Sequence, residues 1–380
     1  MRLVQEVASN RSPRGEDLAA TIHLDDSVCY DFVVSLRALL NPRTYTRSRR
    51  WASEQIPRLS DGVAEKARFL FEGYDTALGY GAARVIPRIS PSPTPSGLID
   101  GVADLPAAEL AEFMLDTGET TPERLQAFRE ILQGGERSLI PQALEGLPAG
   151  WVERCRRVLL DPEGVQADLV ETLDSYLSNI YDQHLESATQ SVTDAARVGR
   201  EMLGLRPAAD VIEHLTGGYR LGDDLELRSI TLAPSVFIYP FMSARFDERT
   251  GEALIIYGVR STTLDGYAPT PLEDDLVTTL KVLADPNRLT IMRLLVEHPL
   301  YTSELVSRLQ LGQSTVHHHL AQLRAARLIR QQRDRHGMQY SVRAAAATRF
   351  VRSLEEWLLP SPSDTASGPE SDSTPPADGQ

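Results

Sequence analysis

The chain of 380 residues carries 39 basic and 53 acidic side chains, a formal net charge of −14, and 42% hydrophobic residues. This composition is ordinary for a globular protein with a buried core. Its two cysteines, Cys29 and Cys155, exclude a disulfide framework and a four-cysteine zinc site. Because no long apolar run and no secretory signal pattern is present, we expect a cytoplasmic protein without a membrane partner.

The part of the chain before residue 271 shows mainly helical patterns. We predict that the polar residues 1–19 form a disordered leader, and that residues 20–270 form a mostly helical sensor or assembly domain with a small antiparallel sheet. The longest helical pattern spans residues 162–204, where apolar residues recur every three or four positions. Four strand-like segments are expected to supply the sheet, at residues 20–24, 225–231, 235–241 and 253–259.

Residues 271–359 are predicted to form a winged helix-turn-helix domain. Here a helix with Thr302 as its N-cap is followed by a short turn and by a second helix over residues 313–326. The apolar residues of the second helix fall on one face, which leaves its polar residues on the other. A helix, a short turn and a polar-faced helix form the arrangement in which the second helix enters the major groove of DNA.

The segments 328–333 and 338–343 are strand-like and joined by a turn, which predicts a two-stranded wing. Residues 300–343 carry seven arginines against two carboxylates, although the chain as a whole is acidic. This asymmetry indicates a DNA-facing module on an acidic body. The side chains predicted to contact double-stranded DNA are those of Gln313, Ser314, Thr315, His317, His318, Arg324, Arg330, Arg333, Arg335 and His336.

The first and last helices predicted in this domain each carry an apolar stripe at helical spacing. The stripes consist of Leu272, Leu276, Leu280 and Leu283 in the first helix, and Phe350, Leu354 and Trp357 in the last. Residues 360–380 follow; they are acidic, rich in Pro and Ser, and predicted to form a disordered tail.

Three segments in order, Leu280–Leu295, Ser303–Leu309 and Gln313–Leu320, resemble the ArsR family of bacterial winged-helix transcription regulators. The resemblance implies a homodimeric repressor that a small-molecule effector releases from DNA. It also implies that the first and last helices of the domain, and thus the two stripes, form the dimer interface. A two-fold dimer should read an inverted-repeat operator.

The chain departs from the family pattern at several positions. The family often has Gly where Gln310 stands and Ser where Gly312 stands, and His317 replaces a common Ser in the recognition helix. Family members that bind metals use cysteines before the recognition helix or histidines in the last helix. Residues 301–305 lack cysteine and residues 344–359 lack histidine, so we predict no metal and no cofactor.

Two groups of residues admit a second interpretation. The run His317-His318-His319 could suggest a metal site, but successive helical residues point about 100° apart and cannot converge on one ion. Tyr181 and His184 lie on the long helical pattern and are candidates for a ligand pocket. The alternative for His184 is a hydrogen-bonded residue of the core.

Two other functions remain open at this point. The N-terminal domain could recruit a protein partner, which would make the chain a DNA-binding scaffold. It could also be an enzyme fused to a DNA-binding domain, but the sequence contains no nucleophile elbow, no His-Glu-x-x-His and no Cys-x-x-Cys motif. We therefore predict a ligand-responsive regulator without enzymatic activity.

Overall fold

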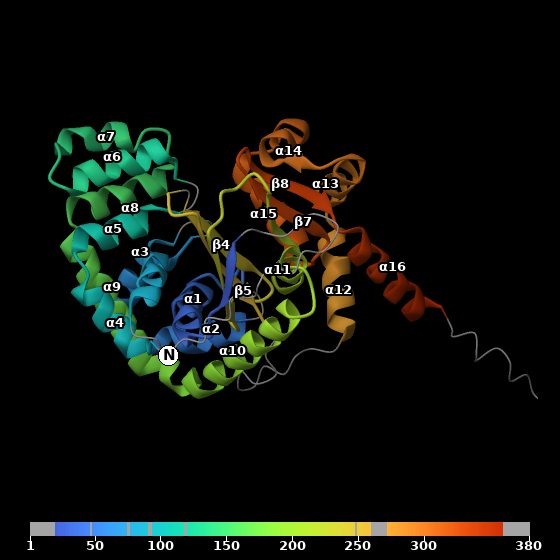
Figure 1. The fold of residues 1–380 in the computed structure, drawn as a ribbon, viewed down its shortest axis with the longest axis horizontal. Coiled ribbons are helices and arrows are strands. Elements are labelled where there is room, and N and C mark those ends of the chain that lie inside the picture. The colour runs from blue at the N-terminus through green and yellow to red at the C-terminus, as the bar shows by residue number, and fades with distance from the viewer. Residues whose placement is uncertain are drawn as a thin grey trace, which may run out of the picture. The chain divides into compact units, whose positions relative to one another are not determined.

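A computed structural model describes seven stretches of the chain: residues 20–45, 48–73, 77–89, 93–117, 120–247, 249–259 and 272–359. The predicted leader and tail lie outside the described residues. The chain divides into two compact units, which Figure 1 shows in colour by residue number. The first unit contains the residues up to 269 together with residues 331–339, and the second contains residues 270–330 and 340–380.

The first unit is mainly helical, as predicted. Its helices are α1 (Val28–Leu40), α2 (Arg49–Gln55), η2 (Ile56–Arg58), α3 (Asp61–Phe71), η3 (Leu78–Arg84), η4 (Ile86–Arg88), α4 (Pro95–Asp104), α5 (Ala107–Leu115), α6 (Pro122–Leu132), η5 (Arg137–Leu139), α7 (Ile140–Ala143), α8 (Ala149–Leu160), α9 (Pro162–Tyr176), the π-turn η6 (Leu177–Tyr181), α10 (Asp182–Leu203) and α11 (Ala208–Thr216). Helices α5 to α8 gather in one group, whereas α1 and α10 both pack on strand β3 (Figure 1).

Several helix starts follow one local rule of sequence. In α4, α6 and α9 a Thr or Asp occupies the N-cap, its side chain accepts a hydrogen bond from a backbone N–H of the first turn, and proline follows. The cap satisfies a donor that the helix leaves open, and proline at the first position loses no helical hydrogen bond. The capping residues are Thr94, Thr121 and Asp161.

The long helical pattern of residues 162–204 is present, but its middle is wound differently. Helix α9 passes through the π-turn η6 into α10. A π-turn adds one residue to a helical turn and so rotates the residues after it relative to those before. Ile180 and Tyr181 of this turn are both buried.

The sheet of the first unit contains four strands in the order β1-β3-β5-β4. They span Thr21–Leu24 (β1), Ser229–Ser235 (β3), Met242–Asp247 (β4) and Glu252–Gly258 (β5). Strands β4 and β5 form an antiparallel hairpin, but the prediction of a purely antiparallel sheet is wrong. Strand β3 runs parallel to both β1 and β5, with Ile230 opposite Ile22 and Ala253. Periodicity in sequence locates strands but does not encode which strand lies beside which.

The segment 235–241 was expected as a strand, yet β3 ends at Ser235 and the next residues cross to β4 without pairing. The cause is the buried carboxylate of Asp31 in α1. Its Oδ1 accepts hydrogen bonds from the Ser235 hydroxyl at 2.6 Å and from the backbone N–H groups of Val236 at 2.8 Å and Phe237 at 3.3 Å. The Tyr181 hydroxyl donates to Oδ2 at 2.8 Å. The backbone N–H groups of Val236 and Phe237 therefore bind a side chain instead of a neighbouring strand.

The second unit contains the predicted winged helix-turn-helix elements. They are α12 (Leu272–Leu283), α13 (Pro286–Glu297), β6 (Leu300–Tyr301), α14 (Thr302–Leu309), α15 (Gln313–Ala325), β7 (Ile329–Asp334), β8 (Gly337–Val342) and α16 (Ala344–Leu358). Residues 331–339 of the β7–β8 hairpin, its tip, belong to the first unit. There, strand β2 (Tyr219–Leu221) pairs in parallel with residues 331–333 of β7. None of the described helices is long and apolar enough to cross a membrane.

Candidate nucleic-acid interface

The turn between α14 and α15 has the geometry that a helix-turn-helix requires. Helix α14 ends at Leu309, and its C-cap Gln310 has a φ of 55°, in the left-handed region. Gly312 then caps α15 with extended backbone. A left-handed residue at this point reverses the chain direction quickly, which explains why glycine would be favoured there. Thr302, expected as the N-cap of α14, is instead its first residue. The backbone N–H of the preceding Tyr301 donates to Glu304 Oε2 at 2.8 Å.

Helix α15 separates an apolar face from a polar one. Val316, Leu320 and Leu323 are buried against the rest of the second unit. Gln313, Thr315 and His318 are exposed. The side chain of Ser314, also predicted to contact DNA, lies outside the described part of the structure. The result is a helix held by one face, with short polar and imidazole side chains directed to solvent on the other.

The three consecutive histidines have different surroundings. His318 is exposed, whereas His319 is 7% exposed and its Nδ1 lies 3.7 Å from Asp285 Oδ1. Burial lowers the pKa of His319, and the nearby Asp285 carboxylate opposes this shift. His317 is half-buried, and its Nε2 has no hydrogen-bond partner among the described residues. The three rings therefore diverge, and no described group of three or more His, Cys, Asp or Glu side chains is placed to hold a metal ion.

Arg324 lies in the last turn of α15. The other arginines predicted to contact DNA lie in the β7–β8 hairpin, residues 329–342, which we call the wing. Arg324, Arg330 and Arg333 are half-buried, and Arg335 and His336 at its turn are exposed. Arg335 is already engaged within the first unit. Its guanidinium pairs with Glu226 Oε1 at 2.9 Å, and its backbone N–H donates to Asp224 Oδ2 at 2.8 Å.

The partners of the wing tip were not predicted from sequence. The pairing of β2 with β7 is reinforced by Gly222, whose N–H donates to the carbonyl of Arg333 at 2.7 Å. A strand of three residues has no readable period, so β2 could not be recognised from its pattern. The sequence did contain one signal for these contacts. The acidic segment with Asp224 and Glu226 supplies carboxylates that can pair with an arginine-rich hairpin.

Tyr181 and His184, the candidates for a ligand pocket, both lie in the core of the first unit. Besides the bond of Tyr181 to Asp31, Trp51 Nε1 donates to His184 Nε2 at 3.2 Å. Phe237 packs against both rings. The hydrogen bond from Trp51 engages Nε2 of His184 within this core. Neither residue lines the pocket described below.

The exposed polar face of α15, the left-handed turn before it and the basic hairpin after it define a helix-turn-helix domain of the DNA-binding kind. Comparison with known proteins agrees. The family model described as bacterial regulatory protein, arsR family, matches residues 285–331. The C-terminal part of the chain is therefore an ArsR-family DNA-binding domain of transcription regulation, and it follows a large N-terminal extension.

Solved structures are also similar to part of this chain. HlyU from Vibrio cholerae N16961 is 28% identical, and the match covers 23% of this chain and 96% of that chain with a TM-score of 0.20. NolR from Sinorhizobium fredii is 27% identical, with coverages of 23% and 93% and a TM-score of 0.20. No curated protein matches this chain. The identified domain is a regulatory DNA-binding one, and the family match does not extend to the residues before 285.

Proposed function

We propose that this protein is a homodimeric transcription regulator that binds an inverted-repeat operator through α15 and the wing, and that a small molecule controls this binding. The observation that carries the proposal is the polar face of α15, where Gln313, Thr315 and His318 are exposed while the opposite face is buried. These side chains are able to hydrogen-bond base edges in the major groove. The arginines of the wing then hold backbone phosphate and fix the register of the helix.

The dimer is supported by apolar side chains that the second unit leaves in solvent. Helices α12 and α16 contact each other, and α16 has no buried residue. Val351 is 58% exposed, Trp357 65% and Leu358 61% on α16, and Leu280 is 38% exposed on α12. An exposed apolar patch of this kind indicates a protein interface. A second copy of the chain would cover it in the isologous way that two-fold symmetry requires.

The predicted interface residues differ in how far the single chain exposes them. Leu276, Leu283, Phe350 and Leu354 are half-buried, whereas Leu280 and Trp357 are exposed. The side chain of Leu272 lies outside the described part of the structure. Helices α12 and α16 are in contact within one chain, and the exposed side chains remain for a partner.

The test is fluorescence anisotropy with labelled DNA from upstream of the gene that encodes this protein, against a scrambled duplex, at 50 and 200 mM salt. Tighter binding to the upstream DNA, weakened by salt, is the expected result. A Thr315→Ala, His318→Ala variant should bind both duplexes equally, because it loses two base-reading side chains and retains the wing. Equal binding of the wild type to both duplexes at each salt concentration would contradict the proposal.

A further inference from the structure

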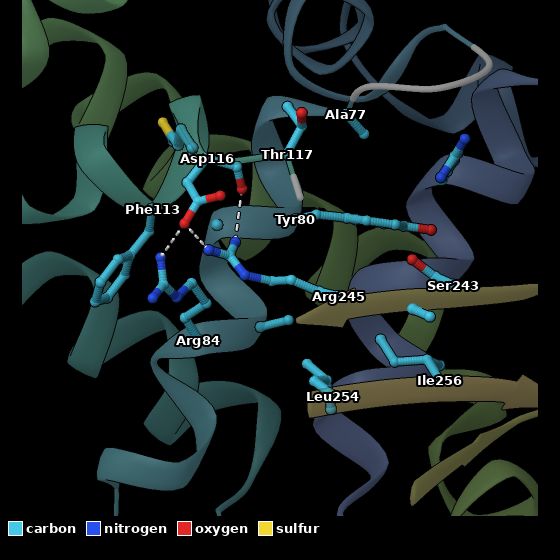
Figure 2. A pocket seen from close by; sticks show the side chains of 15 residues that line it. Ala77, Tyr80, Arg84, Phe113, Asp116, Thr117, Ser243, Arg245, Leu254 and Ile256 are labelled. Carbon is cyan, nitrogen blue, oxygen red and sulfur yellow. Dashed lines mark hydrogen bonds and ion pairs between the residues drawn. The ribbon is translucent and has the colours of Figure 1, made fainter. Parts of the chain in front are cut away.

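The first unit contains a pocket of about 80 Å³ between α1, η3, the end of α5 and the strands β4 and β5. Its lining combines three arginines with hydroxyl groups and an apolar wall. Figure 2 shows Arg84, Arg245 and Asp116 gathered at one end, and Leu254 and Ile256 of β5 along one side. The family model matches residues 285–331 and does not cover this part of the chain.

The polar end of the pocket is a pair of arginines that share one carboxylate. Arg84 donates to Asp116 Oδ2 at 3.3 Å and to Asp247 Oδ2 at 3.1 Å. Arg245 donates to the carbonyl of Asp116 at 2.6 Å and also to its carboxylate. A guanidinium has five N–H donors, and these bonds use two from each arginine. Both side chains are only 17% exposed.

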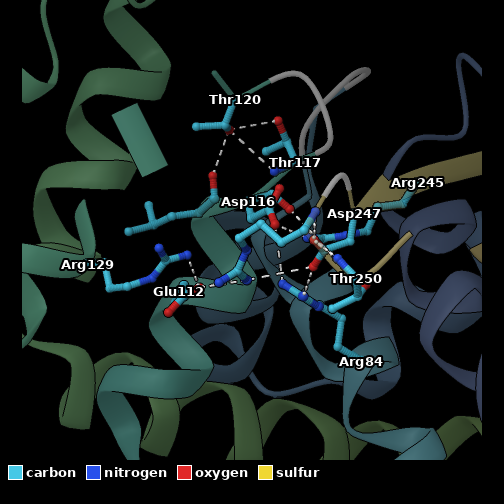
Figure 3. A network of polar contacts seen from close by, with 11 residues as sticks. Arg84, Glu112, Asp116, Thr117, Thr120, Arg129, Arg245, Asp247 and Thr250 are labelled. Atoms are coloured by element: carbon cyan, nitrogen blue, oxygen red, sulfur yellow. Dashed lines mark hydrogen bonds and ion pairs between the residues drawn. The ribbon is translucent and has the colours of Figure 1, made fainter. Parts of the chain in front are cut away.

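Among the described residues, arginines outnumber carboxylates around this end of the pocket. Figure 3 shows the wider network around Asp116 and Glu112. The ion pairs of the described residues in this network join four arginines to three carboxylates. Its members are Arg84, Arg129, Arg245, Arg249, Glu112, Asp116 and Asp247. The pocket wall adds Arg37, whose guanidinium carbon lies 5.1 Å from the centre of the Tyr80 ring.

Burial and the neighbouring Arg245 lower the pKa of Arg84 to about 10, although Asp116 and Asp247 act in the opposite direction. Burial likewise lowers the pKa of Arg245. Two crowded, partly buried cations that retain donors form a site that an anion would stabilise.

The remaining wall restricts the kind of anion. Tyr80, Thr117 and Ser243 offer hydroxyl groups, and burial raises the pKa of Tyr80, so its hydroxyl keeps its proton and can donate. Leu254 and Ile256 present aliphatic surface. A fully polar anion such as inorganic phosphate would leave this aliphatic surface uncovered. The volume is about half that of a 150 Å³ cavity that holds benzene, so it suits only a compact molecule.

We propose that this pocket binds a short aliphatic carboxylate, with its carboxylate toward Arg37, Arg84 and Arg245 and its hydrocarbon part against Leu254 and Ile256. The molecule is the effector of the regulator, and this second statement alone rests on the proposed function. The binding itself is a property of the first unit and does not require DNA.

The test is isothermal titration calorimetry of the full chain, without DNA, with sodium acetate, butyrate, benzoate and phosphate at an ionic strength held constant with chloride. Butyrate should bind about fifteenfold more tightly than acetate, since each of its two additional buried methylenes contributes a factor of about four. Benzoate and phosphate should bind more weakly than butyrate, one because of its size and the other because it has no apolar part. No measurable carboxylate binding, or phosphate binding as tight as that of butyrate, would overturn the proposal.

Variants connect the binding to the pocket. Arg37→Gln keeps a polar side chain on α1 but removes one cation, and should weaken butyrate binding at least tenfold. Tyr80→Phe removes only a hydroxyl and should also weaken it, so the test remains if the first variant folds poorly. The matched control is Arg88→Gln. Arg88 lies 4.6 Å from the Phe113 ring, which Arg84 also faces, but it is outside the pocket lining and 50% exposed.

The control variant should bind butyrate as the wild type does. Unchanged binding in both Arg37→Gln and Tyr80→Phe would place the ligand elsewhere and overturn the assignment. Anisotropy with the preferred DNA, with and without butyrate, then separates the two proposals. A butyrate-dependent change in the DNA Kd supports the effector role. An unchanged Kd for DNA overturns the effector role but leaves the binding site supported. If the protein does not bind DNA at all, the proposed function is overturned, whereas the butyrate binding measured by calorimetry is unaffected.

Discussion

Replacement of Arg335 by Gln should weaken the binding of every DNA sequence and reduce its dependence on salt. Arg335 stands at the exposed turn of the wing and, if it contacts one phosphate per protomer, a dimer loses two contacts in the variant. Each phosphate contact contributes about 0.9 to the slope of log K against log salt, so the slope should fall by about 1.8. Between 50 and 200 mM salt the wild type should therefore lose about twelvefold more affinity than the variant.

The ion pair between Arg335 and Glu226 allows a second test, because Glu226 competes with DNA phosphate for the Arg335 guanidinium. Arg335 is 57% exposed and Glu226 90% exposed. Exposed pairs of this kind contribute at most about 1 kcal/mol, so phosphate can compete for the guanidinium. Glu226→Gln removes the competitor and a nearby negative charge, and should tighten DNA binding up to about fivefold per protomer at low salt.

Both variants are measured by anisotropy over a salt series, with Arg50→Gln as the control. Arg50 is an exposed arginine paired with Glu54 on α2, within the first unit. Its replacement should leave the slope unchanged. A slope for Arg335→Gln equal to that of the wild type would remove Arg335 from the interface and refute the reasoning.

Three further predictions concern the core, the recognition helix and the dimer. Asp31→Ala should lower the free energy of unfolding by about 3 to 5 kcal/mol, because it leaves the buried donors of Ser235, Val236 and Tyr181 without an acceptor. A loss below about 1 kcal/mol in urea unfolding would contradict this. Burial lowers the pKa of His319 below its ordinary value of 6.5. As the pH falls through 6.5, the His319 imidazole is therefore protonated more readily in the unfolded chain than in the folded one, which favours unfolding. Stability should therefore decrease from pH 7.5 toward pH 5.5, and His319→Gln should reduce this decrease; an identical pH dependence in the variant would exclude His319 as the cause. Trp357→Glu should convert the dimer into monomers in sedimentation velocity, and an unchanged dimer would exclude α16 from the interface.

The elements of the fold that could be predicted from sequence are those that depend on local rules. The stripe of α15 and the cap at Asp285, whose side chain accepts from the Arg288 N–H at 3.0 Å, are both set by residues within a few positions of each other. The mainly helical class was predicted correctly for the same reason, because helix periodicity dominates the chain.

The elements that could not be predicted depend on partners far away in sequence. The segment after Ser235 has the composition of a strand, but its backbone binds Asp31, more than two hundred residues earlier. The direction of β3 beside β1 follows from the path of the intervening helices, which periodicity does not describe. The same holds for two groups of ion pairs. Arg335 and Glu226 are far apart in sequence, as are Asp116 and its two arginine partners, and only the folded chain brings them into contact.

The central claim is that α15 reads DNA sequence as part of a two-fold dimer. The most direct measurement is selection of bound duplexes from a random double-stranded DNA library by the full chain, followed by sequencing. The predicted result is an enriched inverted repeat whose half-sites are about 10 base pairs apart from centre to centre, and which the Thr315→Ala, His318→Ala variant does not enrich. Absence of any enriched sequence, or enrichment of the same sequence by that variant, would contradict the claim.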